Sequence, residues 1–242
     1  MTCYKNIQVV KNKCLNKKYS NINVIWIHGA NQSSTSFTYL REKCNFDREI
    51  CANYSSTKGF YENLELIFDQ VRQIEQCFLI AHSMGGLYAL HLLQRLNVTG
   101  VVSISTPFNG SRTADWAKFF VPRYPLFRDV GKRSIPINEG HKIIIECPWT
   151  QIVSTTGGVP YHEGPNDGVC TTASMMHRKD DVEIVSVANT HFEVMVSVKV
   201  AEIIKNRYQN IQSKLLAFSG QPSSAKSLSF SQTHPVTIHK TV

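Results

Sequence analysis

A serine at position 83 lies in a pattern that could make it a nucleophile. Residues 79–86 read Leu-Ile-Ala-His-Ser-Met-Gly-Gly, so an apolar run leads into the serine, and small residues, Ala81 and Gly85, lie two positions to either side. A serine on a sharp turn between a strand and a helix has a strained backbone, which only small neighbours tolerate. Such a turn lifts the hydroxyl above the sheet and aims the first N–H groups of the helix at negative charge that forms there. The pattern predicts a nucleophilic serine; the alternative is a small-residue turn with an idle serine.

The histidine next to this serine is a poor candidate for its base. On a tight turn, neighbouring side chains project in different directions, so His82 cannot easily accept the proton of Ser83. We interpret His82 as a packing residue or as a support of the site. The base must then be found among the other histidines, of which the chain has nine in all.

Strand and helix patterns alternate along most of the chain. The elements that they predict must position Ser83 and its base. Strands are predicted at 7–10, 23–27, 49–54, 77–81, 100–105 and 182–187, and further regular elements at 142–146 and 151–154. Helices are predicted at 34–43, 60–76, 86–96 and 194–209. The continuous apolar run at 77–81 is typical of a central strand buried on both faces. This alternation predicts an α/β fold with a mostly parallel central sheet and helices on both faces.

Two segments interrupt the alternation. Residues 111–140 combine aromatic residues with prolines, namely Trp116, Phe119, Phe120, Tyr124, Phe127, Pro122, Pro125 and Pro136. Such an insertion predicts a cap over an apolar pocket, with a packed surface excursion as the alternative. After Phe218 the composition shifts to Ser, Gln, Thr and Lys, which indicates a flexible tail. The predicted organisation is one domain over 1–217, with a lid-like insertion at about 111–140, and a tail over 218–242.

The segment around Ser83 resembles the nucleophile elbow of the α/β-hydrolase superfamily, in the form familiar from bacterial lipases and esterases. Three other segments are similar to the same family: His-Gly at 28–29, Thr-Pro at 106–107 and Asn-Asp-Gly at 166–168. The resemblance spans roughly residues 22 to 205. It implies an α/β-hydrolase fold with a short cap or lid insertion after the sixth strand. Phe108 stands where many lipases have a histidine, so no role is transferred to that side chain.

The resemblance also implies which residues complete the site. The backbone N–H groups of Ala30 and Met84 would form an oxyanion hole. The family order of serine, acid and histidine assigns the acid to Asp167, in the loop 164–169, and the base to His191, after the predicted strand at 182–187. Rivals remain open for both roles: Asp180, Asp181, His162 and His177. His28 is interpreted as a structural hydrogen-bonding residue, and the Asn-Asp-Gly sequence is also an ordinary turn signal.

This reading predicts a serine hydrolase that cleaves carboxylic esters, of small molecules or lipids, through an acyl-enzyme formed by Ser83, His191 and Asp167. The alternatives are a thioesterase or an acyltransferase with the same machinery, or a non-catalytic binding protein on this fold. No cofactor or metal is expected. Some lipases of the family bind calcium through an aspartate soon after the histidine, but here Phe192 and Glu193 follow His191.

Composition limits the expected partners and compartment. The chain of 242 residues is 42% hydrophobic and 18% charged, which suits a folded domain with a sizeable core. Its net charge of +8 predicts a solvated basic face, with weak contact to an anionic membrane surface as the alternative; nucleic acid and an obligate protein partner are not expected. Seven scattered cysteines without a CxxC pair, and the lack of a signal-peptide pattern or an apolar spanning run, predict a cytoplasmic protein, with signal-free secretion left open.

Overall fold

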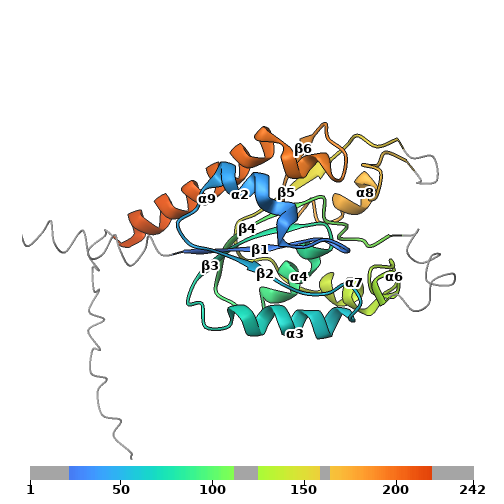
Figure 1. The fold of residues 1–242 in the computed structure, drawn as a ribbon, viewed down its shortest axis with the longest axis horizontal. Coiled ribbons are helices and arrows are strands. Elements are labelled where there is room, and N and C mark those ends of the chain that lie inside the picture. The colour runs from blue at the N-terminus through green and yellow to red at the C-terminus, as the bar shows by residue number, and fades with distance from the viewer. Residues whose placement is uncertain (1–21, 112–124, 159–163, 220–242) are drawn as a thin grey trace, which may run out of the picture.

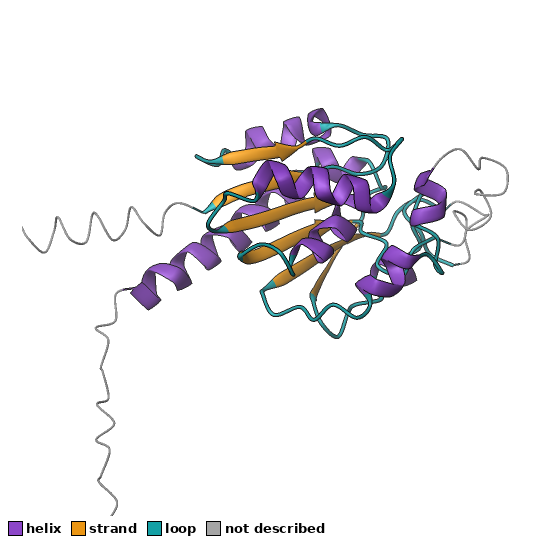
Figure 2. Ribbon diagram, turned by 90° about the horizontal axis from the view of Figure 1, so that it is seen from below, coloured by secondary structure: helices purple, strands orange, loops and turns teal. Residues whose placement is uncertain are grey.

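The computed structural model describes residues 22–111, 125–158 and 164–219, in which six strands form one sheet with the order β2-β1-β3-β4-β5-β6. The strands are β1 (Asn23–Ile27), β2 (Glu49–Ala52), β3 (Cys77–His82), β4 (Val98–Ile104), β5 (Trp149–Ser154) and β6 (Glu183–Val187). Every neighbouring pair is parallel. The strands therefore all end at the same edge of the sheet (Figure 2).

Helices cover both faces of the sheet (Figure 1). They are α2 (Thr38–Cys44), α3 (Phe60–Val71), α4 (Met84–Leu92), α6 (Pro125–Asp129), α7 (Ile135–Gly140), α8 (Thr172–Met175) and α9 (Val198–Ser219), with the 3-10 turns η1 (Ser34–Phe37) and η2 (Glu193–Val196). Helices α2 and α9 pack on one face, and α3 and α4 on the other. Among these described helices, none has the length and apolar character that crossing a membrane requires.

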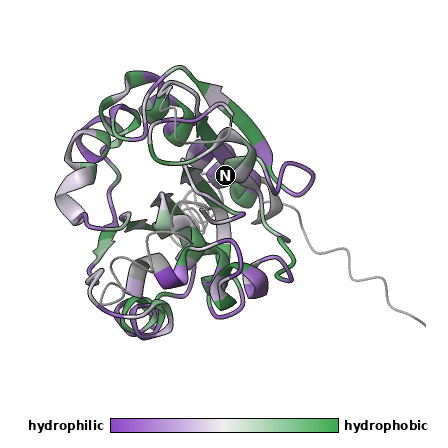
Figure 3. Ribbon diagram, turned by 90° about the vertical axis from the view of Figure 1, so that its right-hand side faces the viewer, coloured by the Kyte–Doolittle hydropathy of each residue, from purple (hydrophilic) through white to green (hydrophobic). Residues whose placement is uncertain are grey.

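Burial of apolar faces explains this arrangement. Strand β3 is buried along its whole length, as its apolar run predicts, and lies between β1 and β4. Helix α9 places Val200, Ile204, Tyr208 and Ile211 on one side, at helical spacing, and buries them against the sheet. The mixed hydrophobic and hydrophilic colouring of the helices in Figure 3 reflects such two-sided elements. The fold is thus a sheet with one apolar core on each face, and its predicted class is confirmed.

Most predicted elements exist, but several boundaries differ. Helix α3 ends at Val71 rather than at residue 76, and α4 occupies 84–92 rather than 86–96. The last helix starts at Val198, because residues 193–196 form a 3-10 turn that ends in an extended Ser197. The prediction of a regular element at 142–146 is wrong: this stretch is coil, and Ile144 in its middle is 77% exposed. It cannot pair beside β5, the next strand along the chain, because β5 is already paired on both sides.

Parts of three predictions fall outside the described residues. The predicted strand at 7–10, residues 112–124 of the insertion and residues 220–242 of the tail all lie there. The division into a domain over 1–217 and a tail over 218–242, and the role of the insertion as a lid, stay predictions. In the described chain the insertion follows β4, which is the fourth strand described.

The described end of the insertion is attached to the body of the fold by polar contacts. The Asp129 carboxylate, at the end of α6, accepts a hydrogen bond of 2.8 Å from the N–H of Phe60 at the start of α3. A negative charge at this position also stabilises the positive end of the helix. The buried Arg178 guanidinium donates to the carbonyl oxygens of Gly140 and Ile143, at 2.9 and 2.8 Å. Residues 125–143 are therefore held by groups from the first and last thirds of the chain.

Helix α4 approaches the loops after β1 and β4 so closely that two glycines are required. A Cβ atom on Gly85 would lie 2.1 Å from the Ile27 carbonyl oxygen and 2.6 Å from that of His28. A Cβ atom on Gly86 would lie 1.9 Å from the Thr106 hydroxyl oxygen. The sequence predicts the glycine at 85 from strain in the serine turn, and the structure adds a contact between backbones as a second reason.

Substitution of Gly85 by Ala should destabilise the protein strongly, because the new methyl group meets fixed backbone oxygens. We expect the free energy of unfolding to fall by about 3 kcal/mol. Urea titration followed by circular dichroism measures this. Gly59→Ala is the matched control, since its Cβ would have no neighbour nearer than 3.6 Å. Equal losses in the two variants would contradict the argument from the close approach.

The histidines inside the fold make stability depend on pH. His91, on α4, is buried against Phe60 and hydrogen-bonded to the Pro136 carbonyl oxygen at 3.0 Å, and burial lowers its pKa below the ordinary 6.5. A histidine with a lowered pKa binds fewer protons in the folded than in the unfolded chain. Its contribution to stability is therefore complete above pH 6.5 and is lost as the pH falls below that value.

We expect the unfolding free energy to decrease as the pH is lowered from 7 to 5, and His91→Gln to show a weaker decrease. One buried histidine contributes a slope of at most about 1.4 kcal/mol per pH unit. Glutamine keeps a donor for the Pro136 carbonyl but does not titrate. The test is urea denaturation at several pH values. An unchanged slope in the variant would show that His91 binds a proton equally well in both states.

Candidate active site

The predicted site residues meet at the carboxyl edge of the sheet. The loops after β1, β3 and β6 supply Ala30, Ser83 and His191, and the loop before α8 supplies Asp167. Strands β1 and β3 are neighbours, yet the chain passes from β1 to β2 on the other side before it reaches β3. In open α/β sheets, ligands bind in the crevice at such a switch point. The topology therefore places Ala30 and Ser83 at this switch point, after two neighbouring strands.

Ser83 occupies the turn between β3 and α4 in a strained conformation. Its φ is +52° and its ψ is −122°, a region that residues with side chains rarely adopt. Two backbone hydrogen bonds hold the turn: Ser83 N–H donates to the Ile104 carbonyl at 2.8 Å, and Gly86 N–H donates to the Ser83 carbonyl at 3.0 Å. The hydroxyl is thus fixed at the start of α4, where the positive end of the helix dipole lies.

His191 lies beside this hydroxyl. Its Nε2 is 3.0 Å from Ser83 Oγ, and its Nδ1 is 2.7 Å from Asp167 Oδ2. The ring is almost fully buried, and the backbone N–H of His191 also donates to the Asp167 carbonyl at 2.9 Å. Since the carboxylate accepts, Nδ1 carries the proton and Nε2 is free to accept one from the serine. The three side chains form a chain along which one proton can move from Ser83 to His191.

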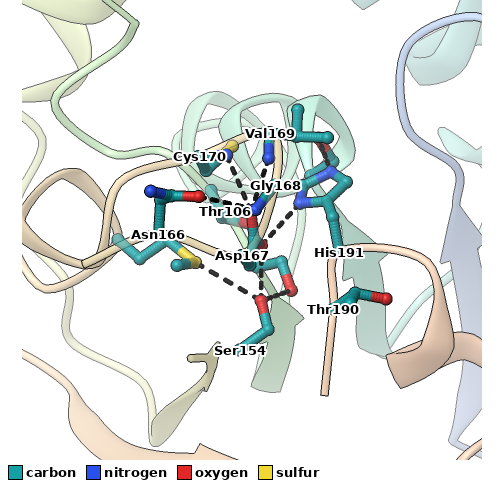
Figure 4. A network of polar contacts seen from close by, with 12 residues as sticks. Thr106, Ser154, Asn166, Asp167, Gly168, Val169, Cys170, Thr190 and His191 are labelled. Atoms are coloured by element: carbon teal, nitrogen blue, oxygen red, sulfur yellow. Dashed lines mark hydrogen bonds and ion pairs between the residues drawn. The ribbon is translucent and has the colours of Figure 1, made fainter. Parts of the chain in front are cut away.

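Asp167 is held by donors on both carboxylate oxygens (Figure 4). Oδ1 accepts from the N–H groups of Val169 and Cys170, at 3.0 and 2.7 Å. Oδ2 accepts from His191 and from the Ser154 hydroxyl, the latter at 2.5 Å. Burial by itself would raise the pKa of this carboxyl, but the bonds to His191, Ser154 and Cys170 outweigh burial, so the pKa lies below its ordinary value. Asp167 is an ionised acceptor.

The rival acids and bases lie elsewhere or outside the described chain. Asp181 pairs with Arg178 at 2.6 Å, at the start of β6 and therefore at the opposite edge of the sheet. Asp180 precedes the same strand. The ring of His177 lies beside that of His141, with centroids 4.4 Å apart. His162 is outside the described residues.

Two further histidines support the site without reaching Ser83 Oγ. His82 Nδ1 lies 2.9 Å from Gln32 Oε1, and its Nε2 lies 3.0 Å from the His191 carbonyl oxygen. Burial lowers the pKa of His82 to about 3, and the charge of His191 adds to this, so the ring is neutral and donates to one of these oxygens at a time. His28 stacks on Tyr54, with ring centroids 4.0 Å apart, and Tyr54 donates to its carbonyl. Both are structural residues, as their positions in the sequence suggest.

The amide groups of Ala30 and Met84 are suited to bind an anion. A Cβ atom added to Gly29, just before Ala30, would lie only 3.0 Å from Ser83 Cβ. The loop after β1 therefore packs directly beside the serine. The Gly29 N–H is used by Gln32 Oε1 at 3.1 Å. Within the described part of the chain, no acceptor bonds the N–H of Ala30 or of Met84, the first residue of α4. Two amide donors beside a nucleophilic hydroxyl can stabilise an oxyanion.

A group of potential metal ligands also occurs here, but its chemistry does not suit a metal ion. Asp167, Cys170 and His191 offer atoms within 4.8 Å of one another, and all three are buried. The carboxylate oxygens already accept four hydrogen bonds, and burial raises the pKa of the Cys170 thiol well above its ordinary value. A metal ion prefers a thiolate and free carboxylate lone pairs, so this group fits a hydrogen-bonded triad better than a metal centre.

Sequence reasoning missed three residues that shape the site. Ser154 is the last residue of β5, and Ser105 directly follows β4. Gln32 bridges His82 and the Gly29 N–H. A polar residue at the end of a buried strand was the available signal for the serines, because parallel strands end at a common edge. Phe108, which replaces the histidine of many lipases, is buried and packs on the edge of Trp149, with ring centroids 5.7 Å apart.

Comparison with known proteins gives a consistent answer on the fold. By sequence, no protein-family model and no curated protein matches the chain. By structure, it is similar to a lipase from Bacillus licheniformis in its mature form, with 16% identity, a TM-score of 0.57, and coverage of 81% of this chain and 92% of that chain. It is also similar to a monoacylglycerol lipase from Paleococcus ferrophilus, with 17% identity, a TM-score of 0.53, and coverage of 80% and 93%.

A phospholipase from Legionella pneumophila, PlaB, is a third match, with 11% identity and a TM-score of 0.53. It matches 64% of this chain, which spans only 45% of the phospholipase chain. At such identities a likeness shows the fold alone. Together with the all-parallel sheet and the turn at Ser83, these matches show that the chain has the α/β-hydrolase fold.

Proposed function

We propose that this protein is a serine hydrolase that cleaves carboxylic esters through an acyl-enzyme on Ser83. The observation that carries the proposal is the contact of 3.0 Å between Ser83 Oγ and His191 Nε2, in a ring whose other nitrogen is bound to a buried, ionised Asp167. The structural likeness to lipases and esterases supports a hydrolase of this fold.

In the acylation step, Ser83 Oγ attacks the ester carbonyl carbon while its proton passes to His191 Nε2. The carbonyl oxygen becomes an oxyanion, and the N–H groups of Ala30 and Met84 donate to it. The charge of Asp167 stabilises the imidazolium. As the intermediate collapses, His191 returns the proton to the alcohol oxygen of the leaving group, and Ser83 keeps the acyl group. Water then attacks this ester and loses a proton to His191. His191 returns that proton to Ser83 Oγ as the bond between Oγ and the acyl carbon breaks and the acid leaves.

An exposed aromatic side chain beside His191 favours an ester with an apolar portion, of a small molecule or of a lipid. Phe192 follows His191 directly, places its ring edge-on to the imidazole with centroids 5.3 Å apart, and is 60% exposed. An exposed aromatic ring at this position can bind part of a substrate in contact with the base. We therefore expect medium-chain p-nitrophenyl esters to be hydrolysed faster than the acetate.

Removal of the serine hydroxyl tests the proposal most directly. A fluorophosphonate probe should label the wild-type protein and not Ser83→Ala, and p-nitrophenyl ester turnover should fall by more than about 10⁴-fold. Ser213→Ala, at an exposed serine of α9, is the matched control and should label normally. Labelling that persists in Ser83→Ala would show that another residue is the reactive nucleophile. Wild-type protein without labelling and turnover would favour a binding protein on this fold.

The choice of Asp167 as the acid is tested against Asp181. In Asp167→Asn the amide can donate to His191 Nδ1 and so impose the wrong tautomer, for which kcat should fall by about 10⁴-fold. Asp181→Asn removes a carboxylate that pairs with Arg178 at the other edge of the sheet, so kcat should stay within about two-fold. Steady-state kinetics on one p-nitrophenyl ester compares the two. The reverse ranking would assign the acid to Asp181.

A further inference from the structure

A buried row of hydroxyl groups extends the polar chain of the site behind Asp167. Ser154 is the last residue of β5, and its Oγ lies 2.5 Å from Asp167 Oδ2 and 2.7 Å from the Oγ of Ser105. Ser105 follows β4 and has a positive φ of 53°. Both serines have no solvent exposure, and Asp167 is 1% exposed. Figure 4 shows Ser154 below Asp167, with its hydroxyl directed at the carboxylate.

The direction of each hydrogen bond in this row follows from counting protons. The ionised carboxylate of Asp167 has no proton, so Ser154 must donate to it. Ser154 has only one hydroxyl proton, so the contact with Ser105 must run the other way, from the Ser105 hydroxyl to Ser154 Oγ. The Met175 thioether, 3.8 Å from Ser154 Oγ, is a weak acceptor and does not compete with a carboxylate. All donors therefore point toward Asp167.

This order matters because Ser154 and His191 share one acceptor atom. Both donate to Oδ2, while the two backbone N–H groups occupy Oδ1. The Ser154 bond fixes the position of Oδ2 and takes up part of its negative charge. The titratable groups that face the carboxylate are His191, the neutral Cys170 thiol and the neutral His82 ring, on which the charge of Asp167 acts. Charge-assisted bonds of this kind polarise the bonds beside them when water is excluded.

We propose that Ser154 is a positioning residue of the triad, which orients Asp167 Oδ2 toward His191, and that Ser105 strengthens it by donating to its oxygen. The inference rests on the proposed serine hydrolase function. Ser154 acts on the reaction only through Asp167 and does not touch the substrate. Its removal should therefore lower the rate of the chemical step and leave substrate binding nearly unchanged.

A buried serine of β4 provides a matched control. Ser103 is also without solvent exposure, and it hydrogen-bonds to the side chains of Gln151 and Trp149 rather than to the triad. Replacement of Ser103 by Ala removes a buried hydroxyl from the same sheet at a similar cost to stability. A purely structural role for Ser154 predicts equal effects of Ser154→Ala and Ser103→Ala on activity, once both proteins are folded.

The experiment compares Ser154→Ala, Ser154→Thr, Ser105→Ala and Ser103→Ala with the wild type, using a p-nitrophenyl ester from pH 4.5 to 9 and the rate of fluorophosphonate labelling. In Ser154→Ala we expect kcat to fall about 10-fold with KM within about two-fold. We also expect the acid limb of the pH profile to move to higher pH, because the Ser154 hydroxyl helps to lower the pKa of Asp167 and its loss leaves the carboxylate with more of its charge unbalanced. Ser154→Thr keeps the hydroxyl and should recover most of the rate. Ser105→Ala should show a smaller loss of the same kind, and Ser103→Ala none.

Each outcome either supports or overturns the proposed role of Ser154. A wild-type pH profile and labelling rate in folded Ser154→Ala would overturn the inference, as would equal losses in Ser103→Ala. If Ser154→Ala does not fold, the ordering of Ser105→Ala against Ser103→Ala carries the test, and a lack of difference between them would overturn the inference. An inactive, unlabelled wild-type protein would instead refute the proposed function, so the two failures are distinguishable.

Discussion

The site depends on a carboxylate that is buried and still ionised. Asp167 lies in a part of the molecule where water cannot stabilise its charge, and burial of an unpaired carboxylate would favour its neutral form. Four donors replace the missing water: two amide groups of its own loop, one hydroxyl from β5 and the ring of His191. The loop folds around its carboxylate, and the arrangement of Asp167 and His191 follows from satisfying that charge.

The all-parallel sheet explains how groups that are far apart in the sequence come together around the Asp167 carboxylate. Parallel strands end at one edge, so the ends of β1, β3, β4, β5 and β6 bring together residues from nearly the whole described chain. The helices on both faces fix the strands in place, and α4 is pressed so tightly on the loops after β1 and β4 that glycines are needed at 85 and 86. The same close packing sets the distance between the Ser83 turn and the loop of Ala30. At this edge of the sheet, the packing of α4 therefore also determines the geometry of the site.

Particular residues show how far the sequence could predict this structure. The apolar run before Ser83 and the small residues around it were sufficient for strand β3, the turn and α4, because each signal is local. The stretch at 142–146 shows the limit of such prediction. Its apolar residues suit a strand, but both edges of β5 are occupied, and Arg178 donates to the Ile143 carbonyl instead. Propensity cannot reveal that a strand position has been filled by another segment.

The supporting groups of the site could not be predicted from the sequence, for a related reason. Ser154 and Ser105 are ordinary strand-end serines until the register of β4 and β5 sets them side by side, and that register pairs Ile104 with Ile152. Gln32 likewise acts only through the turn of its loop back to Gly29 and His82. Local patterns identify groups that need a special backbone, as Ser83 does. Groups that need only a particular neighbour become visible when the strands are aligned.

Alignment of the strands also explains why the hydroxyl row runs in one direction. A serine can donate one proton and accept others, so a row of serines has no preferred order until one end is fixed. The carboxylate fixes that end, since it can only accept. The charge of Asp167 thus orients Ser154, Ser154 orients Ser105, and on its other side the same charge sets the tautomer of His191 that leaves Nε2 facing Ser83.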